Sequence, residues 1–119
     1  MFWTELTRLF AIRQARLMAK LRGVAGFSGR GEIAYAAFGN GAKTVSIKAT
    51  GIAGQKAALF INQQPLGDMN VVSGKIDHQF DSRRGSFIPV LQDGDAVEIH
   101  QNGEPILVGA AQSAALISR

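Results

Sequence analysis

From residue 31 onward, the sequence consists of short β-rich runs separated by turn signals. Apolar and polar residues alternate in runs such as KTVSIKAT, which is the period of a strand with one buried face. Eight short runs of this kind predict a mainly β fold, an antiparallel β-sandwich or barrel of about 7–8 strands. The predicted strands are 31–38, 43–50, 56–62, 66–72, 74–81, 86–91, 96–101 and 104–109.

The turns between these runs have recognisable chemistry. Asn102-Gly103 is the strongest two-residue type I′ hairpin signal in the chain, because both residues tolerate positive φ. Gly39-Asn40-Gly41 predicts a second tight hairpin, and Gln92–Asp95 predicts a turn closed by aspartate side chains. The chain holds 14 glycines in 119 residues, well above the usual share of roughly 7%. This excess agrees with a fold built from many short strands.

The first 22 residues have a different pattern. Projected at about 100° per residue, their large apolar side chains fall in one arc, which predicts an amphipathic α-helix over residues 1–22, ended by Gly23. The apolar arc comprises Phe2, Trp3, Leu6, Leu9, Phe10, Leu17 and Leu21. Arg13 and Lys20 project onto the edge of this arc, where their aliphatic stems can pack while the charges reach water.

Net charge is concentrated in the same segment. Residues 1–22 hold five bases and one acid, whereas residues 23–119 hold eight of each. The predicted organisation is a basic amphipathic helix over 1–22, a glycine-rich linker over 23–30, a β-sandwich domain over 31–111 and a C-terminal tail over 112–119. A cationic helix before a neutral domain suggests a module that is assembled or delivered through its N-terminal segment.

The sequence predicts no catalytic residue, no cofactor and no metal site. His78 and His100 are the only histidines and fall in separate predicted strands, whereas a metal site needs three or four converging ligands. Cysteine is absent, and no serine nucleophile motif is present. Gly26–Gly31 has phosphate-loop spacing but the reverse context, because a helix is predicted before it and a strand after it. The chain is therefore not expected to be an enzyme.

The leading hypothesis is a non-catalytic structural or interaction protein. Its predicted N-terminal helix would dock the β-sandwich into a homo-oligomer or a multisubunit assembly. The residues assigned to this contact are Phe2, Trp3, Leu6, Leu9, Phe10, Arg13, Leu17, Lys20 and Leu21. Protein partners are therefore expected, whereas nucleic acid is disfavoured because the neutral body offers no second basic face.

Two alternatives remain open. The same helix could anchor a peripheral membrane protein on an anionic leaflet. The β-domain could instead bind a carbohydrate or another small ligand, although Tyr35 is the only tyrosine and Trp3 the only tryptophan. Arg83 and Arg84 form a candidate anion contact at a predicted loop tip. No segment has the pattern of a signal peptide or a transmembrane helix, which favours a cytoplasmic or membrane-peripheral location.

Overall fold

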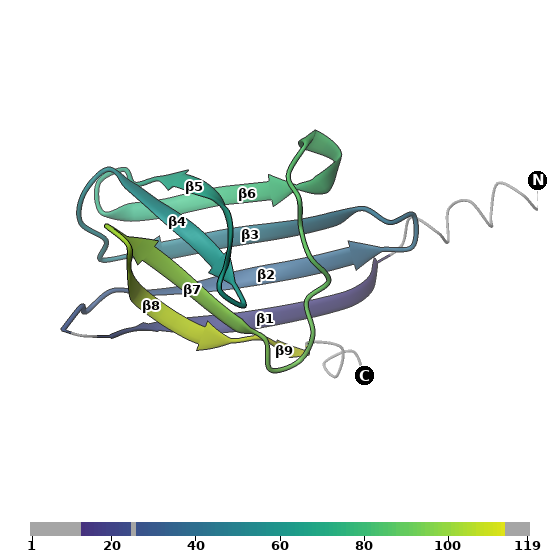
Figure 1. The fold of residues 1–119 in the computed structure, drawn as a ribbon, viewed down its shortest axis with the longest axis horizontal. Helices are drawn as coiled ribbons and strands as arrows, with labels where there is room; N and C mark the ends of the chain where they lie inside the picture. The colour runs from purple at the N-terminus through teal and green to yellow at the C-terminus, as the bar shows by residue number, and fades with distance from the viewer. Residues whose placement is uncertain (1–12, 25, 114–119) are drawn as a thin grey trace, which may run out of the picture.

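A computed structural model describes residues 13–24 and 26–113, which form one nine-stranded antiparallel sheet (Figure 1). The large apolar residues Phe2, Trp3, Leu6, Leu9 and Phe10 of the predicted helix lie outside the described residues. The strands are β1 (Arg13–Gly23), β2 (Arg30–Phe38), β3 (Lys43–Thr50), β4 (Lys56–Ile61), β5 (Gln64–Asn70), β6 (Lys75–Asp81), β7 (Ala96–Gln101), β8 (Glu104–Ala110) and β9 (Gln112–Ser113). A single 3₁₀ turn, η1 (Ser82–Arg84), follows β6.

The sheet curls into a nearly closed barrel. Its strand order is β5-β4-β7-β8-β1-β2-β3-β6, with β9 paired to β1. The two edge strands, β5 and β6, are consecutive in the chain and are joined by a turn with a Val72–Lys75 bridge. Beside this seam, the Phe80 ring lies so close to Gly67 that a Cβ there would come within 2.7 Å of it. The mainly β, antiparallel prediction is therefore confirmed, and the sheet is barrel-like.

The predicted N-terminal helix is wrong for the part of it that the structure describes. Residues 13–23 form β1, which pairs with β2 from Arg13↔Phe38 to Arg22↔Arg30. Leu17, Ala19 and Leu21 are buried, so the side chains alternate with a period of two. The predicted linker is also shorter, because Gly23 ends β1 and Arg30 begins β2.

The wrong period has a physical explanation. Residues four apart share a face both in a helix and in a strand, so Leu17 and Leu21 fit either structure. Ala19 distinguishes the two structures, because it shares a face with Leu17 and Leu21 only in a strand. In a helical projection Ala19 falls outside the apolar arc, and alanine there does not argue against a helix because it is the best helix former.

The barrel interior is filled by inward-facing aliphatic residues from nearly every strand. Its largest fully buried side chains include Ile33, Tyr35, Val45, Ile47, Leu59, Ile61, Met69, Ile76, Val97, Ile99, Ile106 and Leu107. Aliphatic side chains of this size each contribute about 1.5–3 kcal/mol when fully buried. Leu17, Ala19 and Leu21 belong to the same core, so β1 is an integral strand of the barrel.

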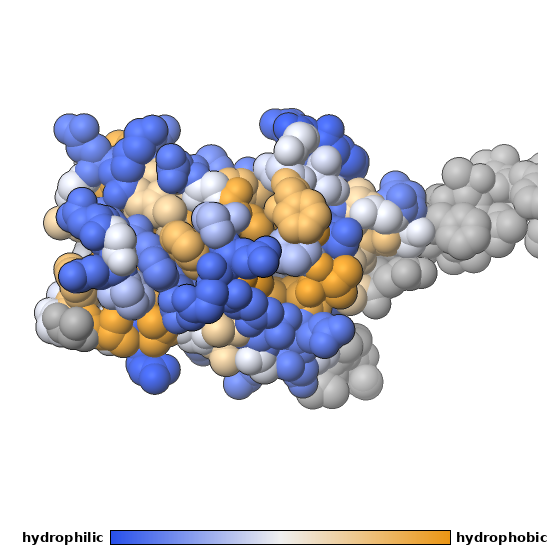
Figure 2. Space-filling view, viewed as in Figure 1, coloured by the Kyte–Doolittle hydropathy of each residue, from blue (hydrophilic) through white to orange (hydrophobic). Residues whose placement is uncertain are grey.

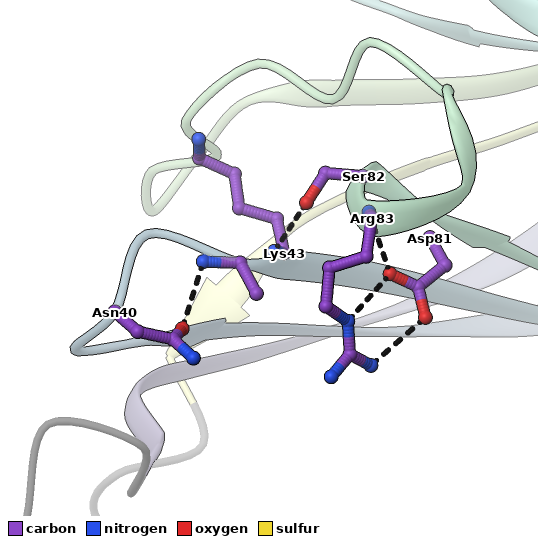
Figure 3. Close-up of polar contacts among 6 residues, drawn as sticks. Asn40, Lys43, Asp81, Ser82 and Arg83 are labelled. Carbon is purple, nitrogen blue, oxygen red and sulfur yellow. Dashed lines mark hydrogen bonds and ion pairs between the residues drawn. The ribbon is translucent and has the colours of Figure 1, made fainter. Parts of the chain in front are cut away.

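The hairpin predictions hold where they rest on turn chemistry. Asn102 and Gly103 have φ values of 53° and 80°, as a type I′ turn requires, and they join β7 to β8. Pro65 is the second residue of the edge strand β5, where its missing N–H is tolerated. Asn40 Oδ1 accepts a hydrogen bond from the Ala42 amide at 3.0 Å and closes the turn between β2 and β3 (Figure 3).

The predicted strand over residues 86–91 is wrong. After η1, this segment runs without regular pairing across the molecule to β7 (Figure 1). Ile88 and Leu91 are buried against the core, while Phe87 and Val90 are 75% and 65% exposed. The apolar run has a strand-like composition, but its backbone does not pair with the sheet, and its buried side chains pack against the barrel core.

Candidate functional site

The two histidines are not brought together. His78 lies on β6 with its ring against Phe80, and His100 lies on the outer face of β7. His100 Nε2 is 2.7 Å from Glu98 Oε1, and its ring stacks on Phe60 with centroids 3.9 Å apart. Within the described residues, no group of three or more His, Asp or Glu side chains could hold a metal ion. The contacts of His100 are those of a packed sheet residue.

One of the two arginines of the predicted anion contact, Arg83, is already paired with a carboxylate of the same chain, whereas Arg84 is not. Arg83 Nε and Nη2 donate to the two carboxylate oxygens of Asp81 at 3.0 and 2.9 Å (Figure 3). The Arg83 side-chain and backbone hydrogen bonds lower the pKa of Asp81 from 3.8 to about 2. Arg83 therefore fixes the turn after β6. Both arginines are exposed, but only Arg84 lacks an ion-pair partner among the described residues.

The strongest concentration of unpaired charge lies on the outer surface of β1, β2, β3 and β6. Because side chains alternate along each strand, the polar residues that lie between the buried ones point away from the barrel. We call this surface the cationic face. Its charged residues are Arg16, Lys20, Arg22, Arg30, Glu32, Lys48, Lys75 and Asp77, all exposed. They comprise six bases and two acids, a net charge of +4.

The register of the four strands arranges these charges in rows that run across the sheet. Lys20 faces Glu32, Glu32 faces Lys48, and Lys48 faces Asp77. Opposite charges directly across neighbouring strands stabilise a sheet by a few tenths of a kcal/mol or more. This row alternates in sign and is neutral in sum, so we call it the balanced row.

The next row toward the Gly23 end of the sheet has no acid. Arg22 faces Arg30, Arg30 faces Thr50, and Thr50 faces Lys75. We call these four residues the basic row. None of its three cations makes an ion pair or side-chain hydrogen bond with another described residue. Like charges directly opposite each other destabilise an antiparallel pair, so the Arg22–Arg30 pair weakens the free protein.

An open hollow of about 750 Å³ covers these two rows. It is lined by residues of β1, β2, β3 and β6 and by Ser28 and Gly29 of the loop before β2. Gly29 packs against the backbone of Thr50 and Gly51, and a Cβ there would come within 2.8 Å of the Thr50 carbonyl oxygen. The loop can lie this close to β3 because residue 29 has no side chain. The hollow therefore places exposed cations around a space large enough for a ligand group.

A small apolar patch lies outside the cationic face, on the segment that crosses from η1 to β7. Figure 2 shows hydrophobic side chains gathered along this crossing segment, amid a largely hydrophilic face. Its most exposed apolar residues are Phe87 and Val90. Two such side chains cover little area compared with a stable protein interface, which buries about 800 Å² per partner.

The four predicted contact residues that the structure describes separate into two groups. Leu17 and Leu21 are buried in the barrel, so they are unavailable to a partner or a membrane. Lys20 lies on the cationic face, and Arg13 begins β1. Sequence reasoning missed Arg30, Lys48 and Lys75 because their alignment depends on strand register. The alternation in 13–23 is a signal that could have placed Arg16, Lys20 and Arg22 on one strand face, but no local pattern aligns the other three bases with them.

Among the described residues, no helix is long and apolar enough to cross a lipid bilayer. Comparison of the sequence with models of known protein families finds no match, and comparison with curated proteins finds no significant match either.

Proposed function

We propose that this protein is a non-catalytic interaction module that docks onto an acidic protein partner through its cationic face. The observation that carries the proposal is the net charge of +4 gathered on the outer surface of four neighbouring strands of the sheet. Such a face attracts acidic surfaces over several ångströms and accelerates their association, and salt weakens the effect.

The charge distribution argues that the partner is a different molecule. The other described residues carry five bases and six acids, a net charge of only −1. A two-fold dimer through the cationic face would oppose two surfaces of +4, and the rest of a second copy cannot neutralise one. Assembly with a heterologous acidic protein therefore replaces the homo-oligomer as the favoured form of the assembly hypothesis.

Sedimentation velocity of the full chain tests this proposal, with poly-L-glutamate as the acidic probe. We expect a monomer alone in 50 mM salt, a heavier complex with the probe, and dissociation of that complex in 500 mM salt. Lys20→Glu/Lys48→Glu should abolish the complex, because it changes the net charge of the face from +4 to zero.

The matched control is Arg84→Glu, which reverses an exposed cation outside the cationic face and should leave the complex intact. Binding that Arg84→Glu removes as effectively as the double variant would contradict docking through this face. A full chain that does not bind the probe in 50 mM salt would refute the proposal.

A further inference from the structure

The basic row has a chemistry distinct from the rest of the cationic face, which we take to be functional. Lys20 and Lys48 each stand beside an acid of the balanced row, whereas Arg22 and Arg30 stand beside each other. Directly opposed residues of an antiparallel pair have Cα atoms about 4.5–5.5 Å apart. Two exposed arginine side chains thus start from directly opposed positions, with no acid in their row.

The arginine pair fits a tetrahedral oxyanion better than a carboxylate. A guanidinium donates two parallel hydrogen bonds to a pair of oxygens, so one carboxylate is fully used by one arginine. A phosphate monoester offers three oxygens and nearly two negative charges at neutral pH, which suits two arginine forks together. Thr50, next in the row, adds a hydroxyl donor, and Lys75 adds a third positive charge.

We propose that Arg22 and Arg30, with Thr50 and Lys75, form a binding site for a phosphorylated side chain of the acidic partner. This inference rests on the proposed function and deepens it by naming the group that the basic row recognises. The acidic residues around such a phosphate would face the remaining cations of the face. A bound phosphate also removes the Arg22–Arg30 repulsion, so binding and strand pairing stabilise each other.

The control variant is provided by Arg16. It lies on β1 and on the same outer face, but it faces Ala36, and six residues of strand, about 20 Å, separate it from Arg22. That distance exceeds the screening length of about 8 Å at physiological salt. Arg16→Gln and Arg30→Gln therefore remove the same charge from the same face but only one of them removes a phosphate contact.

Calorimetric titration of the full chain with three acidic nonapeptides tests the proposal. The peptides differ only at the central residue, which is phosphoserine, glutamate or serine. At 150 mM salt we expect the phosphopeptide to bind at least about tenfold more tightly than the glutamate peptide, the value of one charge-assisted hydrogen bond. Arg30→Gln should remove most of this preference, whereas Arg16→Gln should change it by less than about twofold.

A thermal melt in phosphate-free buffer provides a second readout that does not depend on a peptide. We expect Arg30→Gln to raise the midpoint, because it relieves the repulsion from Arg22, and to abolish the further rise that the phosphopeptide produces in the unmodified protein. Arg16→Gln should leave both quantities unchanged. A midpoint that falls in Arg30→Gln would show that Arg30 has a structural role, and would overturn the repulsion argument.

Three outcomes would overturn the site. The first is equal affinity for the phosphoserine and glutamate peptides, and the second is an equal loss in Arg16→Gln and Arg30→Gln. The third is tighter binding to phosphatidylcholine vesicles containing phosphatidylserine than to the phosphopeptide, which would identify a lipid as the phosphate source. If poly-L-glutamate still binds through Lys20 and Lys48, only the phosphate site fails; if it does not bind, the proposed function fails as well.

Discussion

The hydroxyl oxygen of Tyr35 lowers the stability of the fold in which the residue is buried. The ring is 2% exposed on the inner face of β2, and its hydroxyl has no hydrogen-bond partner among the described residues. A buried hydroxyl without a partner costs about 1–3 kcal/mol, whereas the ring itself contributes to the core. The side chain therefore stabilises the barrel through its ring and weakens it through its oxygen.

Tyr35→Phe should be at least as stable as the unmodified protein, with a gain of up to about 2 kcal/mol, because it removes the unpaired oxygen and keeps the ring. Urea unfolding monitored by circular dichroism measures the difference. Tyr35→Leu is the control for ring packing and should lose stability. A loss of more than about 1 kcal/mol in Tyr35→Phe would show that the hydroxyl is paired.

Asp81 predicts a pH dependence that can be assigned to one group. Its hydrogen bonds with Arg83 lower its pKa to about 2, below the value of about 3.9 in an unfolded chain. A depressed pKa in the folded state stabilises the protein above the unfolded pKa, and this contribution is lost as the pH falls through the folded value. The stabilisation should therefore be complete above about pH 4 and disappear toward pH 2.

Urea unfolding at pH 6, 4, 3 and 2 compares the unmodified protein with Asp81→Asn. The difference in free energy of unfolding should be largest at pH 6 and shrink steadily below pH 4. A difference that stays constant down to pH 2 would show that the Asp81 charge does not contribute, and that the substitution acts by shape alone.

At the scale of the element, β1 is the strand whose identity changes the interpretation of the molecule. From Leu17 to Arg22 every second residue is buried, and the residues between them are half-buried or exposed. The neighbouring strand β8 has Gly109 where an added Cβ would clash with the carbonyl oxygen of Lys20. The absent side chain lets β8 approach the middle of β1 and complete the barrel.

Two neighbouring glutamine substitutions distinguish the strand from a helix. Ala19→Gln should destabilise the protein by more than about 2 kcal/mol, because it forces a larger, polar side chain into the core. Lys20→Gln should change stability by less than about 0.5 kcal/mol, since Lys20 is exposed. Thermal and urea unfolding measure both. Equal effects of the two substitutions would contradict the strand.

Sequence patterns predicted the elements unevenly, for reasons that lie in particular residues. The hairpin at Asn102-Gly103 was predictable because its φ values depend on two adjacent residues. β1 was mispredicted because Leu17 and Leu21 satisfy both periods. The 86–91 segment was mispredicted because Ile88 and Leu91 pack against the core without joining the sheet. Composition alone cannot distinguish this packing from that of a strand.

For the whole molecule, β1 is the strand that holds the two parts of the sheet together. It lies between β8 and β2 in the strand order, and Figure 1 shows β4, β7 and β8 crossing in front of the sheet formed by β1, β2 and β3. Its three buried apolar residues contribute several kcal/mol, comparable with the total stability of about 5–15 kcal/mol of a typical domain. The sheet cannot close without it.

A chain that begins at Gly26 should therefore fail to fold. We expect it to show no cooperative thermal transition and little dispersion of its amide resonances, whereas the full chain should show both. The physical reason is the loss of Leu17, Ala19 and Leu21 from the core, together with the exposure of two unpaired strand edges on β2 and β8. A cooperative transition in the shortened chain would refute the role assigned to β1.

The sequence by itself determined the class of fold, most of the strand positions and the hairpin turns, because alternation and turn conformation depend on neighbouring residues. Only the tertiary structure decided that residues 13–23 form a strand, and that Arg22, Arg30, Thr50 and Lys75 stand in one row. Register between strands distant in the sequence is set by how the whole barrel packs and closes. Three bases of the predicted helix, Arg16, Lys20 and Arg22, therefore lie on one face of a sheet beside bases from three other strands.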